Sequence, residues 1–256
     1  MLARARTIAA ILPALVLCLG IPAGIGAQAA DDGAAPVVVE LFTSQGCSSC
    51  PTADAFLGKL AERKDVLPFS MHVDYWNYMG WTDPYAREKN TARQKAYMHA
   101  LGTGYVYTPQ MVIDGETHVV GSDQRAVDAA IEAARNAPGP HVRVAMHAEA
   151  NGKLHLSIPA SRIEEPASII LVAFDRQRQT EVTAGENTGR SITNYHVVRD
   201  FSKVGTYEGK ATALTIDPQT APVTVSETDG CAVLLQSVRS GTIIGAGMTW
   251  LRANRS

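Results

Sequence analysis

Cys47 and Cys50 are the residues whose type and spacing most clearly support chemistry. They stand two residues apart in "GCSSC", after an apolar run and before a proline. A C-x-x-C pair can form a redox dithiol, half of a metal site or a structural disulfide. Redox chemistry needs a nucleophilic first sulfur and a second thiol close enough to release the mixed disulfide. In that case Cys47 is the expected nucleophile and Cys50 the resolving residue.

The residues around the pair predict that Cys47 lies at a corner between a strand and a helix. Residues 36–42 ("PVVVELF") form a continuous valine-rich run, which is typical of a strand buried on both faces. After Cys50, apolar residues recur at helical spacing, and Pro51 falls in the first turn, where a missing N–H is tolerated. The dipole and the free N–H groups at the start of a helix lower the pKa of a thiol. This position is more specific for redox chemistry than the C-x-x-C spacing alone.

A proline further along the chain supports the redox interpretation. Residues 66–76 indicate a second strand and residues 82–102 a helix, and two β-rich runs then flank an Asp-Gly pair, a strong hairpin signal. Thr108-Pro109 stands directly before the first of these runs. A proline that begins a strand at this point resembles the thioredoxin-like arrangement, which implies a cis peptide bond at Pro109 and a backbone able to pair with an extended substrate. An ordinary trans proline at the start of a strand is the alternative.

The second half of the chain changes to a period of two. "APGPH" (137–141) is typical of a linker. Beyond it, short β-branched runs are separated by Gly, Pro, Asp or Asn, and no stretch favours a helix. This pattern predicts an antiparallel all-β, sandwich-like domain over residues 141–256. No catalytic constellation is evident there, so docking of a partner is the function we expect for it.

Four strings in the chain resemble one family of proteins. "VELFTSQGCSSCP", "HVDYW", "YTPQMVIDG" and "GENTGR" are similar to an uncharacterised family of exported bacterial proteins, a domain of unknown function with a C-terminal β-rich extension. The resemblance implies an α/β thioredoxin-like domain over residues 36–137, in which a cis proline lies against the active-site sulfurs. It covers nearly all of the chain after residue 36 and implies no known substrate. The span from Cys47 to Pro109 is longer than in ordinary thioredoxin, so substrate choice does not carry over, and "GENTGR" suggests no mechanism.

Glu40 is a further candidate, because it is an acid in the middle of an apolar strand. A buried carboxyl group is costly unless it has a role or a partner. Glu40 could transfer protons for Cys50, as an aspartate does in thioredoxins. The alternative is a carboxylate held by backbone donors or by a lysine.

Several aromatic residues could form a binding groove beside Cys47. Trp76, Trp81 and Tyr107, together with Thr108, are candidates for contacting a peptide or a small thiol. Large aromatic side chains mostly serve burial, so packing of the core and of a lid is the alternative. His72 lies toward the end of the second strand, where it could line the site or assist a metal; a hydrogen-bonded packing role is the favoured interpretation.

Length, charge and the first residues limit the possible functions. The 256-residue chain has a formal charge of −2 and no basic block, so a nucleic-acid partner is not expected. Residues 1–29 contain basic residues, an apolar run and an Ala-Gln-Ala pattern, typical of a cleaved signal peptide. We therefore expect a periplasmic or secreted protein with no stable membrane span after cleavage. Cys231 is then an extra thiol, expected to be buried and inert.

The leading hypothesis is an exported thiol–disulfide oxidoreductase with a Cys-Ser-Ser-Cys redox centre. It needs no cofactor, and its partners are protein or small-molecule thiols and disulfides. The two serines carry no charge that would indicate the direction of electron flow. One alternative is a copper or zinc binding or delivery protein that uses Cys47, Cys50 and a histidine such as His72 or His99. Another is a non-catalytic binding module with a static disulfide.

Overall fold

Residues 35–225 and 227–251 are described by the computed structural model of the chain. They belong to one compact unit, which spans Gly33–Ser256. The signal peptide expected over residues 1–29 lies outside the described residues. In the described ranges, no helix combines the length and the apolar character that a bilayer-spanning segment requires.

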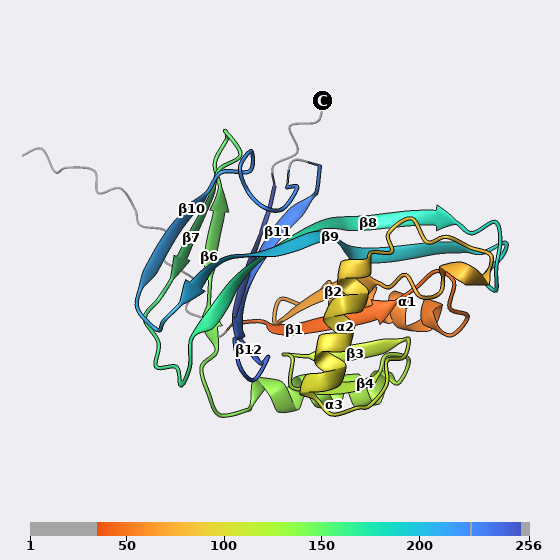
Figure 1. The fold of residues 1–256 in the computed structure, drawn as a ribbon, viewed down its shortest axis with the longest axis horizontal. Helices are drawn as coiled ribbons and strands as arrows, with labels where there is room; N and C mark the ends of the chain where they lie inside the picture. Colours follow the sequence, from red (N-terminus) through yellow and green to blue (C-terminus); the bar gives the residue numbers. More distant parts are fainter. Residues whose placement is uncertain (1–34, 226, 252–256) are drawn as a thin grey trace, which may run out of the picture. The chain divides into compact units, whose positions relative to one another are not determined.

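Among these residues, nine strands form a mixed sheet in the order β4-β3-β1-β2-β9-β8-β11-β12-β5 (Figure 1). Its strands are β1 (Val37–Thr43), β2 (Val66–His72), β3 (Gln110–Ile113), β4 (Thr117–Val120), β5 (Val142–Arg143), β8 (Ala167–Glu181), β9 (Ser191–Tyr207), β11 (Gly230–Ser237) and β12 (Ile243–Trp250). A smaller sheet has the order β10-β7-β6 and consists of β6 (Ala145–Ala148), β7 (Leu154–Ile158) and β10 (Thr212–Ile216). The helices are α1 (Cys50–Leu60), α2 (Glu88–Ala100) and α3 (Gln124–Arg135), with a 3₁₀ helix, η1 (Asn77–Met79).

The expected fold class, an α/β thioredoxin-like domain followed by a separate antiparallel all-β domain, is wrong. The described chain is mostly β, and Ser70 of β2 pairs with Val197 of β9, so strands from both halves belong to one sheet. Phe69 and Phe174 pack edge to face across this junction, with ring centres 5.4 Å apart. The apolar side chains of β2 are thus buried by residues that follow the expected linker, and burial of this surface favours one continuous sheet.

β1 lies between β3 and β2 in the sheet, and helices cover both of its faces. All of its residues are buried. On one face, Leu41 packs with Leu57 of α1 and Ile131 of α3. On the other face, Phe42 packs against Tyr97 of α2, with ring centres 6.1 Å apart. This arrangement explains why the β1 sequence is a continuous apolar run and does not alternate.

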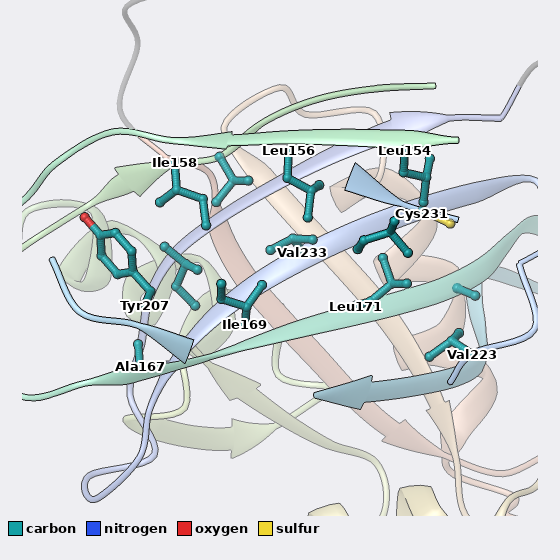
Figure 2. Packing of buried hydrophobic residues seen from close by; sticks show 14 of the residues in the cluster. Leu154, Leu156, Ile158, Ala167, Ile169, Leu171, Tyr207, Val223, Cys231 and Val233 are labelled. Atoms are coloured by element: carbon teal, nitrogen blue, oxygen red, sulfur yellow. The ribbon is translucent and has the colours of Figure 1, made fainter. Parts of the chain in front are cut away.

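A second core lies between the smaller sheet and strands β8 and β11 (Figure 2). Leu156 of β7 points toward Ile169 of β8 and Val233 of β11 (Figure 2). Cys231 belongs to this core and is fully buried, as the sequence predicts. Burial raises the pKa of the Cys231 thiol to about 12, which keeps it protonated at neutral pH.

Candidate functional site

The disulfide lies in the corner between β1 and α1. Cys47 is in the loop after β1, and Cys50, the first residue of α1, is bonded to it, with the two Cα atoms 5.4 Å apart. The Cys50 N–H donates to the Cys47 carbonyl at 3.2 Å, which closes the turn between them. Both cysteines are buried, with Cys47 only 1% exposed, whereas Ser48 and Ser49 are exposed. The pair therefore occupies the strand-to-helix corner expected from the sequence, beneath two serines.

A buried carboxyl group lies one helical turn after the second cysteine. Asp54 follows Cys50 by four positions on α1, so the two side chains share one face of the helix. Thr43 Oγ1 donates to Asp54 Oδ1 at 2.9 Å, while Oδ2 is buried with no partner within hydrogen-bond distance among the described residues. Burial raises the pKa of Asp54 to about 7, although the charge of nearby His72 opposes the rise. The side chain of Asn194 in β9 is also near enough to lower the pKa of Asp54 slightly. Asp54 can therefore gain or lose a proton near neutral pH.

His72 and Asp83 form a second buried pair beside this carboxyl group. His72 Nδ1 lies 2.7 Å from Asp83 Oδ2, and both side chains are fully buried. Burial alone would lower the pKa of His72, but the carboxylate of Asp83 raises it above its ordinary value. For Asp83 the effects are reversed. Burial alone would raise its pKa, but His72 and the backbone N–H of Gln45 bring the pKa below its ordinary value. Because Asp83 Oδ2 accepts that N–H at 2.9 Å, the charged pair also fixes the loop that leads to Cys47.

This arrangement occupies His72 and gives the metal-binding alternative no geometric support. Over residues 35–225 and 227–251, no three His, Cys, Asp or Glu side chains come together in a way that could hold a metal ion. His72 instead serves as a hydrogen-bonded packing residue, which is the interpretation the sequence favoured. The helix expected over residues 82–102 begins only at Glu88, as α2, and the carboxylate of Asp83 points into the site.

Glu40 lies on the other face of β1, away from α1. Its carboxylate is bound by Arg93 of α2, with Nε 2.6 Å from Oε1 and Nη2 2.9 Å from Oε2. Tyr97 donates a further hydrogen bond to Oε2 at 2.5 Å. Glu40 and Phe42 are two positions apart in β1 and share the face that α2 covers. Thr43, the partner of Asp54, lies on the face that α1 covers. The structure thus brings Asp54, and not Glu40, to the side of the sheet that carries Cys50.

The tip of the long β8–β9 hairpin closes over the disulfide corner. We call residues 182–190 the hairpin tip; in Figure 1 it lies at the end of β8 and β9 beside the loop that precedes α1. Asn187 is buried, and its Nδ2 donates to the carbonyl oxygens of Gln45 and Cys47, each at 2.9 Å. Glu186 Oε2 accepts the N–H of Ser48 at 3.3 Å. Residues about 140 positions apart in the chain therefore form one site.

Two tryptophans lie beside the loop that precedes Cys47. Trp76 Nε1 donates to Thr108 Oγ1 at 2.8 Å. A Cβ at Gly46 would lie 3.3 Å from Trp76 Cβ and 3.4 Å from the Trp76 carbonyl oxygen, so glycine allows the close approach of this residue. Trp81 Nε1 donates to Gln45 Oε1 at 3.1 Å. The tryptophans thus pack against the residues that precede Cys47, and Trp76 links them to Thr108.

The expected cis peptide bond is present between Thr108 and Pro109. The carbonyl of Pro109 accepts the N–H of Gly121 at 2.9 Å, and Gly121 packs closely against Ala53 of α1. Tyr107 points elsewhere, because its hydroxyl bonds to His118 Nδ1 of β4 at 2.8 Å. Thr108 and Pro109 are therefore connected to the disulfide corner, whereas the hydroxyl of Tyr107 is directed to the neighbouring strand.

A groove of about 470 Å³ runs between the first turns of α1 and the start of β9. Pro51 and Ala55 form one wall, and residues 190–193 with Tyr195 form the other. The Tyr195 ring closes one end by packing directly on Gly58, where a Cβ would clash with it. The groove begins at Pro51, the residue after Cys50, and neither cysteine lines it.

Sequence reasoning missed Asp54, Asp83 and the hairpin tip. Asp54 could have been found from its spacing, because a residue four positions after Cys50 in a helix lies on the same face. Asn187 lies in "GENTGR", and no periodicity or local motif connects that string with the cysteines. Its role follows from a long-range contact, which sequence patterns do not show.

The fold and the site define the class of protein: a mixed β-sheet protein with a buried C-x-x-C disulfide, covered by a hairpin from its second half. Residues 38–236 match the family model described as "Protein of unknown function (DUF1223)", and the chain belongs to that family. No curated protein among those compared matches the chain.

Two solved structures resemble this one. The chain is 37% identical to protein AGR_C_4864 from Agrobacterium tumefaciens, with a TM-score of 0.74, covering 84% of this chain and 94% of that one. It is 13% identical to HBP35 of Porphyromonas gingivalis, with a TM-score of 0.61, covering 85% of this chain and 76% of that one. The second likeness concerns the fold alone.

Proposed function

We propose that the protein is an exported thiol–disulfide oxidoreductase, active in the periplasm or after secretion, whose reactive group is the Cys47–Cys50 pair. The observation that carries the proposal is Asp54, a buried acid one turn behind Cys50 with one oxygen unpaired and a pKa of about 7. A purely structural disulfide needs no such group, and burying it is costly. A redox pair needs a proton acceptor for its second thiol, which Asp54 provides.

The reaction begins from the dithiol form when the substrate is a disulfide. The Cys47 thiolate attacks one substrate sulfur, forms a mixed disulfide and releases the other substrate sulfur as a thiolate. Asp54 takes the proton of Cys50, whose thiolate then attacks Cys47 Sγ and releases the second substrate thiol. The Cys47–Cys50 disulfide forms, two electrons pass to the substrate, and the reverse sequence oxidises a dithiol.

Access to the sulfurs requires a movement of their cover. Cys47 is 1% exposed, beneath Ser48, Ser49 and the hairpin tip. The exposed serines and the adjoining groove indicate an approach from the α1 side, where an extended peptide segment could lie against Pro51 and the start of β9. Trp76 and Thr108, which are joined by a hydrogen bond, are proposed to hold the substrate near Pro109.

The same burial favours a second candidate function, a binding module with a static disulfide. Cys47 and Cys50 are as inaccessible as core residues, and Asn187 holds their loop closed. In this alternative the Cys47–Cys50 bond only stabilises the corner, and the β-rich second half docks a partner. The two functions differ in the reduction potential that they require.

Equilibration of the purified protein with glutathione redox buffers tests the proposal. We expect a reduction potential in the range of catalytic pairs, whereas a structural disulfide typically lies below about −300 mV. The Cys50→Ala variant should form mixed disulfides through Cys47 with a cysteine-containing peptide, and Cys47→Ala is its matched control. A pair that resists glutathione and a Cys50→Ala variant that captures no peptide would together favour the static disulfide.

A further inference from the structure

We infer that Glu186 biases the Cys47–Cys50 pair toward the disulfide and thereby makes the protein an electron donor. This inference rests on the proposed function and addresses the direction of electron flow, which the two uncharged serines of the motif leave open. The feature that points to it is the hairpin tip, in which the exposed Glu186 places its carboxylate on the N–H of Ser48, the residue after the expected nucleophile.

The position of Glu186 is determined by its neighbour. Asn187 is 1% exposed and donates to the carbonyl oxygens of Gln45 and Cys47, so the backbone of the tip is anchored on both sides of Gly46. The carboxylate of Glu186 then reaches the N–H of Ser48 at 3.3 Å. Two consecutive residues of the tip therefore contact Cys47 itself and the residue directly after it.

Two effects of this contact act against a Cys47 thiolate. A negative charge close to a second negative charge disfavours its formation. The Ser48 N–H is already engaged by Glu186, so it is not available to stabilise the sulfur. The other titratable groups near this loop are Asp54 of α1 and the Asp83–His72 pair. The charge of Asp83 is already balanced by its ion pair with His72. Arg190 lies in the wall of the adjoining groove.

The consequence for the redox equilibrium follows from mass balance. One protein disulfide and two glutathione thiols give one protein dithiol and one glutathione disulfide, with two electrons and two protons transferred. A less stable thiolate lowers the share of the dithiol form, whereas strong oxidants of this type have a stabilised reduced form. Glu186 therefore favours passing electrons from the protein to a substrate disulfide.

The test compares three full-length variants by their equilibrium with glutathione at pH 8. Glu186→Gln keeps a hydrogen-bond acceptor but removes the charge, and Glu186→Lys reverses the charge. Glu208→Gln removes the same charge from an exposed residue directly after the far end of β9 and is the control. We expect Glu186→Gln to shift the equilibrium constant about tenfold toward the dithiol, or about 30 mV, Glu186→Lys to shift it further, and Glu208→Gln to leave it unchanged.

A further measurement separates charge from a structural effect. The shift should shrink in 1 M salt, which screens the interaction. An equilibrium constant for Glu186→Gln equal to that of the wild type and of Glu208→Gln would overturn the inference while leaving the oxidoreductase proposal intact. A wild-type protein that never equilibrates with glutathione would overturn both.

Discussion

Glu40 and Asp54 are both buried carboxylic acids, and they lie near opposite faces of β1. Arg93 binds both oxygens of Glu40, and Tyr97 adds a third donor. Asp54 has one hydrogen bond, from Thr43, and one oxygen without a partner among the residues described. The difference shows that burial alone does not mark an acid as a proton carrier. The carboxylate of Glu40 is paired with the charge of Arg93 and belongs to the packing of the sheet. Asp54 has no such counter-charge bound to it and can still gain or lose a proton.

The largest expected effect is a loss of stability when Glu40 is replaced. Glu40→Gln leaves the buried Arg93 guanidinium without its counter-charge, so we expect a loss of about 3–5 kcal/mol in the free energy of unfolding. Urea titration at pH 7 measures it. The glutathione exchange rate of the folded protein should stay at the wild-type value. A small loss of stability together with slow exchange would reverse the roles assigned to the two acids.

The next effect concerns the rate of exchange on the Asp54 side. Asp54→Asn removes the proton acceptor behind Cys50, so we expect the resolving step to slow about a hundredfold at neutral pH. Stopped-flow measurement of mixed-disulfide decay reports this step. Asp114→Asn is the matched control, since burial also raises the pKa of Asp114 to about 7, but this residue is bound to the Val38 N–H at the start of β1. Equal slowing in both variants would remove Asp54 from the mechanism.

The same Asp54→Asn variant should be more stable than the wild type above neutral pH. The folded pKa of about 7 lies above the ordinary aspartate value of 3.8, so ionisation of Asp54 opposes folding increasingly as pH rises from 4 to 7. The shift sets a ceiling of about 4 kcal/mol, and we expect a gain of about 2 kcal/mol, because the amide must also be buried. Urea titrations at pH 8 and pH 4 should show the gain and its disappearance. A gain of the same size at pH 4 would contradict the assigned pKa.

The smallest expected effect is on the cover of the site. Asn187→Ala removes two hydrogen bonds to the disulfide loop, so we expect reduction by dithiothreitol to become about threefold to tenfold faster. Asn136→Ala, an exposed change at the end of α3, should leave the rate unchanged. A rate unaffected by Asn187→Ala would mean that the hairpin tip does not limit access to Cys47.

Much of the disulfide corner could be predicted because its signals are local. The valine-rich run before Cys47 and the helix after Cys50 are visible as patterns of a few residues, and so is Thr108-Pro109. The pairing of β2 with β9 and the anchoring by Asn187 depend on contacts over more than a hundred positions. Such contacts are decided by which apolar faces are buried together, and a periodic pattern does not identify the partner.

The junction between β2 and β9 has a consequence for how the gene can be divided. A fragment that ends near residue 137 would leave the edge of β2 unpaired and its apolar side chains without the face that covers Phe69. Such an edge is prone to aggregation. The fragment would keep both cysteines yet lack Glu186 and Asn187. The two halves of this protein are therefore not interchangeable modules, and a recombined chain would inherit the sulfur pair without the residues that hold its loop.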